Sequence, residues 1–391
     1  MKSFPAYYVE TFFDGFAWHR GGWCFQQNGR GNYRISVEPK AKGCQVLALA
    51  PLINMHAHLS HVPRYNNLSG ATVLENKPNV GNGSFNERIF YSAQDSALNG
   101  VKIVCSSIRP EDVDDLIRIY NDLPIYIIPF LSIKQYHDHE LIIHLLKKLE
   151  DFFIKSNLHI RPALMIHSLY NITEKEMLLY SQYALEHKIV LSIHFFEWEE
   201  EMDFYNNPNG HNEGDIFTRM RANWPKKTLE TYLEKFSKNE NLMKVLVHCN
   251  YLPYQLANVT HGINNLVVFC PTSCVRLRNK AAMPKSLNKI SFSTDGYFTN
   301  MGYNLFTEIK TYNILSQIND LNYHPDCLIS GITGNSMNYI YRSGLISNNT
   351  LINNIRNINF FRKKCGFLPS ENEGFDLLNY HDSYDRINID E

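Results

Sequence analysis

Residues 189–197 read Ile189-Val190-Leu191-Ser192-Ile193-His194-Phe195-Phe196-Glu197. The apolar run is typical of a buried strand, and it ends in two chemically active side chains that are three residues apart. Side chains alternate between the two faces of a strand, so this odd offset places His194 and Glu197 on opposite sides while the strand stays regular. Both can face one pocket when the strand ends at the His and the following loop carries the Glu. We therefore expect a site at the carboxyl end of this strand.

Short apolar runs of this kind recur along the chain and alternate with helical patterns. Seven others lie at residues 44–54, 101–106, 125–131, 162–166, 245–248, 266–270 and 290–295. Capping boxes at residues 84–87 and 173–176, and Pro110 in a first turn, mark helix starts between them. Eight parallel strands joined by helices predict an α/β fold of the (β/α)8 TIM-barrel type. A doubly wound open sheet is the alternative, but no glycine-rich phosphate loop follows any of these strands.

The composition restricts the kinds of molecule that the chain is expected to bind. The chain has 391 residues, 44% of them hydrophobic, and a formal net charge of −1. This balance gives no general attraction to nucleic acid or anionic membranes, and no apolar run is long enough to span a membrane. Glu10 and Asp14 interrupt the amino-terminal pattern, which therefore does not predict a signal peptide. The eight cysteines show no paired CxxC spacing, so we expect free thiols and a cytoplasmic location. The partner that we expect is a small-molecule substrate.

Polar side chains that can bind a metal follow the apolar runs. They are His56 and His58 after the first run, and His167, His194, His248 and Asp295 after four later ones. The carboxyl ends of barrel strands face one mouth, where these side chains would converge. Three of the His residues and the Asp would form a divalent metal site with nitrogen and oxygen ligands and an open position for water.

Each of these signals has a simpler interpretation when it is taken alone. An isolated His-x-His is weak evidence for a metal site, and a single His after an apolar run is more often a hydrogen-bonded core residue. Thr294-Asp295-Gly296 alone would indicate a turn. The acidic run at residues 199–201 is typical of a solvated helix start. The conjunction favours a site, because every one of these groups lies at the end of a run and none at its start.

The motifs resemble the amidohydrolase superfamily, in the branch of the cytosine, guanine, adenosine and S-adenosylhomocysteine deaminases. The matching pieces are Asn54-Met55-His56-Ala57-His58, His194-Phe195-Phe196-Glu197, the run before His248, Cys270-Pro271-Thr272-Ser273 and Ser293-Thr294-Asp295-Gly296. The Thr-Asp-Gly ending and Ala163-Leu164-Met165-Ile166-His167 resemble the S-adenosylhomocysteine and aminodeoxyfutalosine deaminases most. The resemblance implies the barrel together with a small β-rich domain built from both chain ends.

The chain departs from the family pattern in three places. Pro51-Leu52 stands for the usual Pro-Gly, and Cys274 stands for an Asn. The sequence after Gly334 lacks the usual return strands, so we expect the β-rich domain to be reduced, with residues 375–378 as its remnant. The expected divisions are a β-rich segment at 1–50, the hydrolase barrel at 51–335 and a helical or irregular segment at 336–391.

The resemblance also implies a role for each site residue. One divalent ion, zinc first and iron second, is bound by His56, His58, His194 and Asp295. Asp295 also accepts the proton of the attacking water, Glu197 shuttles it, and His248 donates to the developing oxyanion. The substrate contacts are His167, Arg109 and Trp198. These roles agree with general chemistry, because a bound metal lowers the pKa of its water to about 7.

The implied reaction is hydrolytic deamination of an aminated purine-like or other nitrogen heterocycle. A hydroxide at the metal attacks a ring carbon, and ammonia leaves. One alternative keeps the metal but cleaves an amide or a ring C–Cl bond, and another is an inactive barrel that serves as a binding protein. Homodimers are common in the family. The polar insertion at residues 206–214 is either a lid or a passive surface loop.

Overall fold

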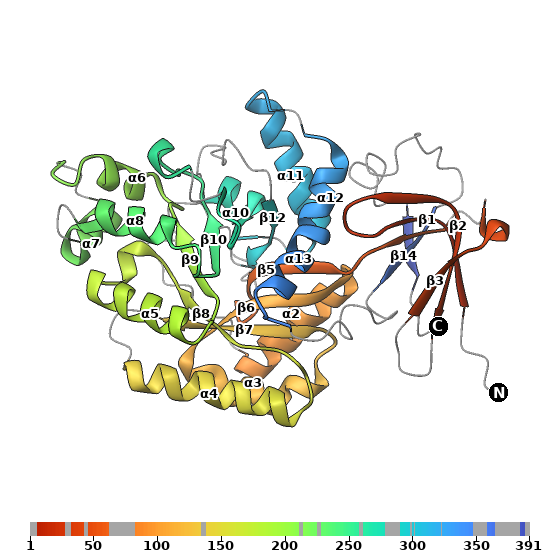
Figure 1. The fold of residues 1–391 in the computed structure, drawn as a ribbon, viewed down its shortest axis with the longest axis horizontal. Helices are drawn as coiled ribbons and strands as arrows, with labels where there is room; N and C mark the ends of the chain where they lie inside the picture. The colour runs from red at the N-terminus through yellow and green to blue at the C-terminus, as the bar shows by residue number, and fades with distance from the viewer. Residues whose placement is uncertain are drawn as a thin grey trace.

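Two β-sheets organise the chain in the computed structural model (Figure 1). The structure describes residues 6–27, 33–42, 46–61, 83–133, 138–210, 214–224, 228–257, 261–277, 290–297, 299–300, 302–321, 323–346, 358–363 and 384–387. Residues 211–213 of the polar insertion and the expected remnant at 375–378 lie outside these ranges.

The larger sheet is parallel and closes on itself. Its strands are β5 (Leu52–His58), β6 (Val101–Ile108), β7 (Tyr126–Ile133), β8 (Ala163–Ile166), β9 (Leu191–Phe195), β10 (Lys244–His248), β11 (Asn265–Phe269), β12 (Ile290–Phe292) and β13 (Asp295–Gly296). β12 pairs with β11, and β13 pairs with β5, although the two are separated by only two residues. They are therefore the halves of one eighth strand, and its two edges close the predicted (β/α)8 barrel.

Helices connect the barrel strands and cover the outside of the sheet (Figure 1). They are α2 (Phe85–Leu98), α3 (Val113–Ile119), α4 (His139–Lys155), α5 (Glu174–Glu186), α6 (Glu199–Asn206), α7 (Asp215–Asn223), α8 (Thr228–Lys238), α10 (Pro271–Arg276), α11 (Leu305–Ile318), α12 (Pro325–Ile332) and α13 (Gly334–Arg342). Both predicted capping boxes are present: Ser84 and Glu87 open α2, and Thr173 and Glu176 open α5.

Burial on both faces explains why the barrel strands are read so clearly from sequence. All five residues of β9 are buried, and so are all five of β10. A strand covered by helices outside and by side chains inside carries an apolar run rather than an alternation. At the other end of β10 the buried Lys244 donates from Nζ to the carbonyls of Phe236 (2.7 Å) and Asn239 (2.9 Å), so its charge meets the last turn of α8.

The smaller sheet joins the two ends of the chain. Its order is β15 (Tyr384–Ile387), β14 (Asn359–Lys363), β4 (Val46–Leu49), β1 (Ala6–Phe13), β2 (Trp18–Gln27) and β3 (Tyr33–Val37). β14 pairs antiparallel with β4, so the segment after the barrel supplies two return strands. The expectation that residues 375–378 are the one remnant was therefore wrong. The charged pair Arg362-Lys363 hid β14, because these residues resemble a solvated surface segment.

The two sheets are connected through close backbone and side-chain contacts. The indole Nε1 of Trp18 donates to Asp326 Oδ1 on α12 at 2.8 Å. Gly334, the first residue of α13, lies against the turn after β1, where a β-carbon on it would stand 2.1 Å from the carbonyl oxygen of Gly15. A side chain larger than hydrogen cannot fit there, so this glycine sets how closely the barrel approaches the small sheet.

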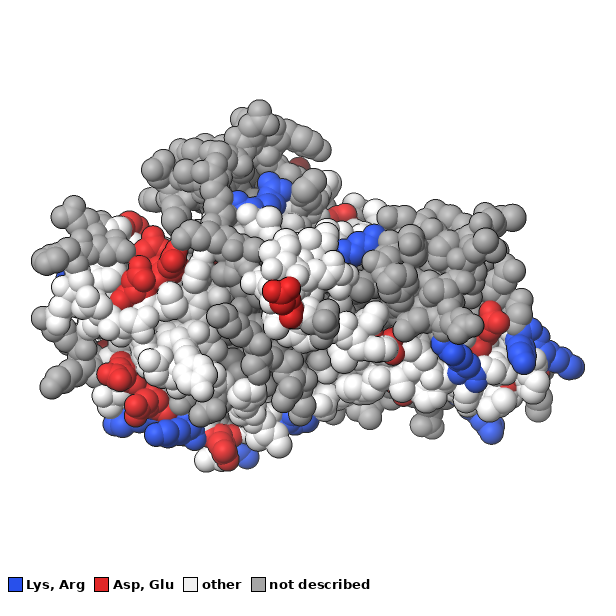
Figure 2. All heavy atoms as spheres, turned by 90° about the horizontal axis from the view of Figure 1, so that it is seen from above, with Lys and Arg blue, Asp and Glu red and all other residues white. Residues whose placement is uncertain are grey.

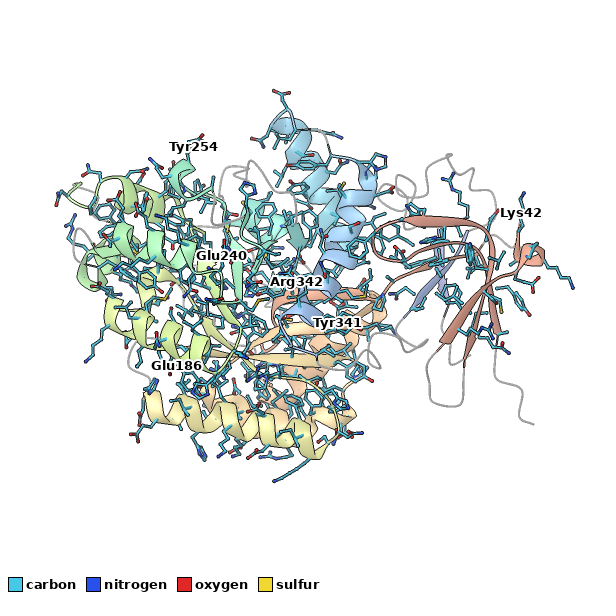
Figure 3. All side chains as sticks on the ribbon, viewed as in Figure 1. Lys42, Glu186, Glu240, Tyr254, Tyr341 and Arg342 are labelled. Atoms are coloured by element: carbon cyan, nitrogen blue, oxygen red, sulfur yellow. The ribbon has the colours of Figure 1, made fainter. Side chains whose placement is uncertain are left out.

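The outer surface carries charges of both signs. On the described part of the face in Figure 2, basic and acidic side chains occur in small separate groups. Arg342 on α13, labelled in Figure 3, donates to Asn264 Oδ1 at 3.0 Å and so joins the last barrel helix to the segment before β11. None of the helices in the described residues has the length and apolar character needed to cross a membrane.

Candidate metal centre

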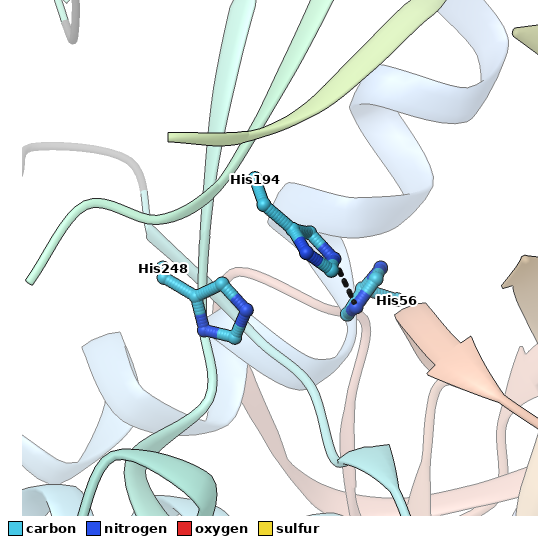
Figure 4. A group of neighbouring side chains, drawn as sticks. All are labelled: His56, His194 and His248. Atoms are coloured by element: carbon cyan, nitrogen blue, oxygen red, sulfur yellow. Dashed lines mark hydrogen bonds between the residues drawn. The ribbon is translucent and has the colours of Figure 1, made fainter. Parts of the chain in front are cut away.

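Five of the predicted residues meet at the carboxyl ends of the barrel strands. His56 and His58 end β5, His194 lies on β9, His248 ends β10 and Asp295 begins β13. All five are buried. His56 Nε2 is 3.1 Å from His194 Nε2, and Asp295 Oδ1 is 3.3 Å from the Nε2 atoms of both His56 and His58. Figure 4 shows His56 and His194 facing each other, with His248 beside them.

These spacings fit a divalent ion. The ligand atoms of His56, His58 and Asp295 lie within 4.8 Å of one another, and so do those of His56, His194 and His248. Zinc binds imidazole nitrogen at about 2.0–2.1 Å, so two ligands of a tetrahedral zinc stand roughly 3.3 Å apart. The distances from His56 to His194 and from Asp295 to His56 and His58 are close to this value. The structure therefore places two possible groups of three ligands together, and His56 belongs to both.

Electrostatics keep the imidazoles able to bind a cation. Burial lowers the pKa of His58 and of His194 well below the usual range, and it lowers the pKa of His248 to about 4. The three rings are therefore neutral at neutral pH, and each keeps a nitrogen lone pair. Burial alone would raise the pKa of Asp295, but the hydrogen bond with His56 and the nearby His58 and His248 hold it well below its usual range. The centre thus combines neutral nitrogens with one carboxylate.

Glu197 reaches the same pocket because the chain turns sharply after β9. The strand ends at Phe195, one residue later than expected, and Phe196 has a left-handed backbone with φ of 48°. This conformation costs about 1–3 kcal/mol for a residue other than glycine. It turns the chain so that Glu197 Oε2 lies 3.9 Å from His194 Nδ1 and Oε1 lies 3.7 Å from His248 Nε2. The turn therefore brings His194 and Glu197 together, although their three-residue spacing would place them on opposite faces of a regular strand.

Hydrogen bonds from the end of β10 hold this turn in place. Cys249 N donates to the carbonyl of Phe195 (2.9 Å), and Tyr251 N donates to that of Phe196 (3.0 Å). Asn250 Nδ2 donates to the carbonyl of Glu197 (3.1 Å). His248 and Cys249 are themselves left-handed, with φ of 73° and 55°. Two strained strand ends therefore brace each other, and they fix the backbone of Glu197.

The Glu197 carboxyl lies in surroundings that favour its protonated form. Burial and the nearby carboxyls of Asp295 and Glu201 raise its pKa well above the usual range. Glu201 is also fully buried, and its Oε2 accepts from the backbone N–H of Trp198 at 3.0 Å. Burial raises the pKa of Glu201 to about 8. The composition of the acidic run indicated that it is solvated. Its third member, Glu201, points inward instead, so the run is only partly solvated.

The three predicted substrate contacts differ in their placement. His167 follows β8, with its ring centroid 4.7 Å from that of His194, and Asn171 Nδ2 lies 3.4 Å from its Nδ1. Trp198 is buried next to Glu197. Arg109 follows β6, but its guanidinium forms a two-pronged pair with Asp112, with Nε at 2.6 Å and Nη2 at 3.0 Å. Unlike His167 and Trp198, Arg109 therefore has its polar group paired with another side chain of the protein, Asp112.

The structure adds residues that sequence reasoning gave no role. Ser273 and Thr299 donate their hydroxyls to Asp295 Oδ2, at 2.7 and 2.6 Å. Asn54 Nδ2 donates to Thr294 Oγ1 at 2.8 Å and thereby ties the first barrel strand to the eighth. His61 stacks on His58 with ring centroids 4.8 Å apart. Two of these lie in motifs quoted above, since Ser273 ends Cys-Pro-Thr-Ser and Asn54 opens the His-x-His segment.

Comparisons with known proteins support the fold. No protein-family model and no curated protein matches the sequence. Solved structures do match. Aminofutalosine deaminase of Helicobacter pylori has a TM-score of 0.69 at 16% identity, covering 97% of this chain and 98% of that one. A Xanthomonas campestris adenosine deaminase with bound zinc has a TM-score of 0.74 at 13% identity, covering 96% and 88%.

A third solved structure acts on another kind of bond. Atrazine chlorohydrolase of Arthrobacter aurescens, complexed with zinc, has a TM-score of 0.66 at 14% identity, covering 95% of this chain and 89% of that one. Each of the three alignments covers 95% or more of this chain. The chain therefore has the fold that the motif resemblance implied, the one that these deaminases and the chlorohydrolase share.

Proposed function

We propose that this chain is a metal-dependent hydrolase that deaminates an aminated, purine-like nitrogen heterocycle and releases ammonia. The carrying observation is the placement of two buried carboxyls around the histidine cluster. Glu197 lies 3.7 Å from His248 Nε2 and 3.9 Å from His194 Nδ1, whereas Asp295 lies 3.3 Å from both His56 and His58. The pKa of Asp295 is held well below its usual range, whereas that of Glu197 is raised well above it. Deamination needs both states, because one group must take a proton from water while another delivers a proton to the ring.

The ligand set described above would hold the ion through four side chains, which are His56, His58, His194 and Asp295. When bound, a divalent ion lowers the pKa of its water to about 7 and so supplies a nucleophile at neutral pH. Two buried polar atoms at the centre, His194 Nδ1 and His248 Nε2, have no hydrogen-bond partner among the described residues. Such atoms are rare in folded proteins and mark a place where a ligand completes the hydrogen bonding.

The side chains divide the proton transfers between them. Asp295 carries the negative charge that accepts the proton of the attacking water. Glu197, held by the braced turn after β9, delivers its proton to a ring nitrogen. Of the two protons of the attacking water, one then goes to the leaving ammonia and the other restores Glu197. His248, with its proton on Nε2, is directed at the oxygen on which negative charge develops. Trp198 and His167 flank this arrangement and supply contacts to the heterocycle.

A second reaction has a specific observation in its favour. The chlorohydrolase with the same fold removes chloride from a triazine, according to its name. A ring carbon attacked by water can lose chloride instead of ammonia, and the same acid and base would serve. A barrel without catalysis is less well supported, because possible metal ligands and the Glu197 carboxyl are buried close together.

One experiment separates the three functions. The purified chain would be analysed for bound metal and then assayed for ammonia against a panel of aminopurine nucleosides and nucleobases, and for chloride against chlorotriazines. We expect one zinc or iron ion per chain and ammonia release. Metal with chloride or amide cleavage and no ammonia would select the second function. A chain that binds no metal would contradict both enzymatic functions.

Other properties of the enzyme are also proposals. Zinc is the first choice of metal, since two of the similar structures contain it. The six described cysteines form no disulfide, which supports a reducing cytoplasm. We propose the divisions 1–50, 51–335 and 336–391 for the chain, with a homodimer as its assembly. Light scattering of the purified protein tests the assembly directly.

A further inference from the structure

The two oxygens of Asp295 have different surroundings. Oδ1 faces the Nε2 atoms of His56 and His58, each at 3.3 Å. Oδ2 points the other way and accepts hydrogen bonds from the hydroxyls of Ser273 (2.7 Å) and Thr299 (2.6 Å). Hydrogen bonds to a charged carboxylate are short and strong, and these two have the lengths expected of that class. One oxygen is therefore occupied by the protein, and the other is left for the metal centre.

The two hydroxyls belong to separate segments that one buried carboxylate connects. Ser273 lies in α10, and Thr299 lies in the turn after β13. Glu308, in the first turn of α11, accepts from the backbone N–H of Thr272 through Oε2 (3.0 Å). Its Oε1 accepts from Asn300 Nδ2 (2.7 Å). Each carboxylate oxygen of Glu308 thus accepts from the residue adjacent to one of the two hydroxyl donors.

Asn300 extends the connection back to the eighth strand. Its Nδ2 also donates to the carbonyl of Thr294, the residue before Asp295, at 2.7 Å. Glu308 is fully buried, and burial raises its pKa to about 7 despite the hydrogen bonds that it accepts. A buried carboxyl is expensive unless its partners compensate, so its position needs a reason. Capping α10 would need one acceptor only, whereas this side chain uses both oxygens on two segments.

We propose that Glu308 is a positioning residue for the metal centre, holding both hydroxyl donors so that Asp295 offers the ion one oxygen, Oδ1. This rests on the proposed function in that it takes the centre to bind a metal. Without the two hydroxyls the Asp295 carboxylate could rotate and offer either oxygen or both. Partners behind a metal ligand typically contribute about 10- to 100-fold in metal affinity or activity.

The test measures metal binding, so it does not depend on knowing the substrate. Glu308→Gln keeps the shape and can still accept from Thr272. Its amide NH2 then faces the NH2 of Asn300, so the hydrogen bond from Asn300 is lost. Zn2+ affinity would be measured by chelator competition, and the visible spectrum would be recorded on the chain loaded with Co2+, which reports the atoms around the ion. We expect Zn2+ affinity to fall about 10- to 100-fold and the Co2+ spectrum to change.

Two further variants connect the effect to Asp295. Ser273→Ala removes one hydroxyl, and if Glu308 acts through it, the double variant should lose little more affinity than the worse single one. Thr299→Val should weaken binding, whereas Thr299→Ser, which keeps the hydroxyl, should restore it. Thr311→Val is the matched control: it removes another contact between α11 and α10, the 3.4 Å approach of Thr311 Oγ1 to Thr272 Oγ1, and keeps the Glu308 carboxylate with its Thr272 N–H and Asn300 donors. It should leave affinity and spectrum unchanged.

The contradicting results are equally definite. Folded Glu308→Gln with wild-type Zn2+ affinity and Co2+ spectrum would overturn the inference, as would losses that simply multiply in the double variant. If Glu308→Gln does not fold, unchanged affinity in Ser273→Ala and Thr299→Val would overturn it instead. A wild-type chain that binds Zn2+ but releases no ammonia would refute the deaminase function and leave this inference standing. A chain that binds neither ion would refute both.

Discussion

The two sides of the metal centre are built on opposite principles. On the side of β5 and β13, both oxygens of Asp295 have partners, and the carboxylate keeps its charge. On the side of β9 and β10, His194 Nδ1 and His248 Nε2 lack hydrogen-bond partners among the described residues, and Glu197 favours its proton. A satisfied charge suits a group that binds an ion permanently. Unsatisfied atoms and a raised pKa suit groups that exchange protons with a substrate.

Removing a ligand should have the largest effect, because it breaks the binding side outright. His56→Ala takes away the nitrogen that faces Asp295 Oδ1 at 3.3 Å. We expect metal content and activity to be lost together. The variant should also lose the stabilisation that a ligand of the folded state provides, which is about 4 kcal/mol at a free metal concentration 1,000 times its Kd. Elemental analysis and thermal unfolding with and without chelator measure this. Two tightly bound ions per wild-type chain would contradict the single ligand set.

Glu201 provides a test of how the reacting side is supported. Its pKa is raised from the ordinary 4.5 to about 8 in the folded chain, so the folded state keeps a proton that the unfolded state has lost. Its contribution to stability is therefore greatest below about pH 4.5 and declines as the pH rises to about 8. The slope is at most about 1.4 kcal/mol per pH unit.

Glu201→Gln should remove this decline and change turnover only a fewfold, because the amide oxygen still accepts from Trp198 N–H. Glu201→Ala should lower turnover more, since the turn that carries Glu197 loses its support. Urea unfolding at pH 5 and pH 8, together with rates for both variants, measures these effects. Equal turnover in the Ala and Gln variants would show that Glu201 does not position Glu197.

Lys244 should give the smallest effect on activity, because it lies at the start of β10, at the opposite end of the strand from His248. Its pKa is lowered from 10.5 to about 8, chiefly by burial. Here the unfolded chain binds the extra proton, so stability should rise as the pH increases from about 8 to about 10.5. Lys244→Met leaves the carbonyls of Phe236 and Asn239 without this donor and should cost about 1–3 kcal/mol. Turnover at 25 °C should stay within a fewfold of wild type. A large loss would show that the start of β10 influences the site at its carboxyl end.

Sequence reasoning identified the binding side more fully than the reacting side. Buried parallel strands carry unmistakable apolar runs, so His56, His58 and Asp295 could be placed at strand ends from order alone. The left-handed turn at Phe196 could not be predicted, because a bulky aromatic residue gives no signal for positive φ.

Residues with a misleading local context were missed for similar physical reasons. Glu201 belongs to an acidic run, and nothing in the run marks which member faces inward. β14 ends in Arg362-Lys363, which resemble solvated residues, and its strand character depends on pairing with β4, about 310 residues earlier in the chain. Glu308 acts through segments that contact each other only in the fold. Long-range partners decide all three, and a pattern of neighbouring residues does not contain them.

The role of Glu197 as the proton shuttle is the central claim, and Glu197→Gln tests it most directly. The amide keeps the shape but cannot take up and release a proton at neutral pH. With metal content held equal, we predict a loss of about a hundred- to ten-thousandfold in turnover, with KM little changed. Glu200→Gln, on the same acidic run and partly exposed, is the matched control and should remain within a fewfold of wild type. Equal, near-native rates in the two variants would contradict the shuttle and most of the case for deamination.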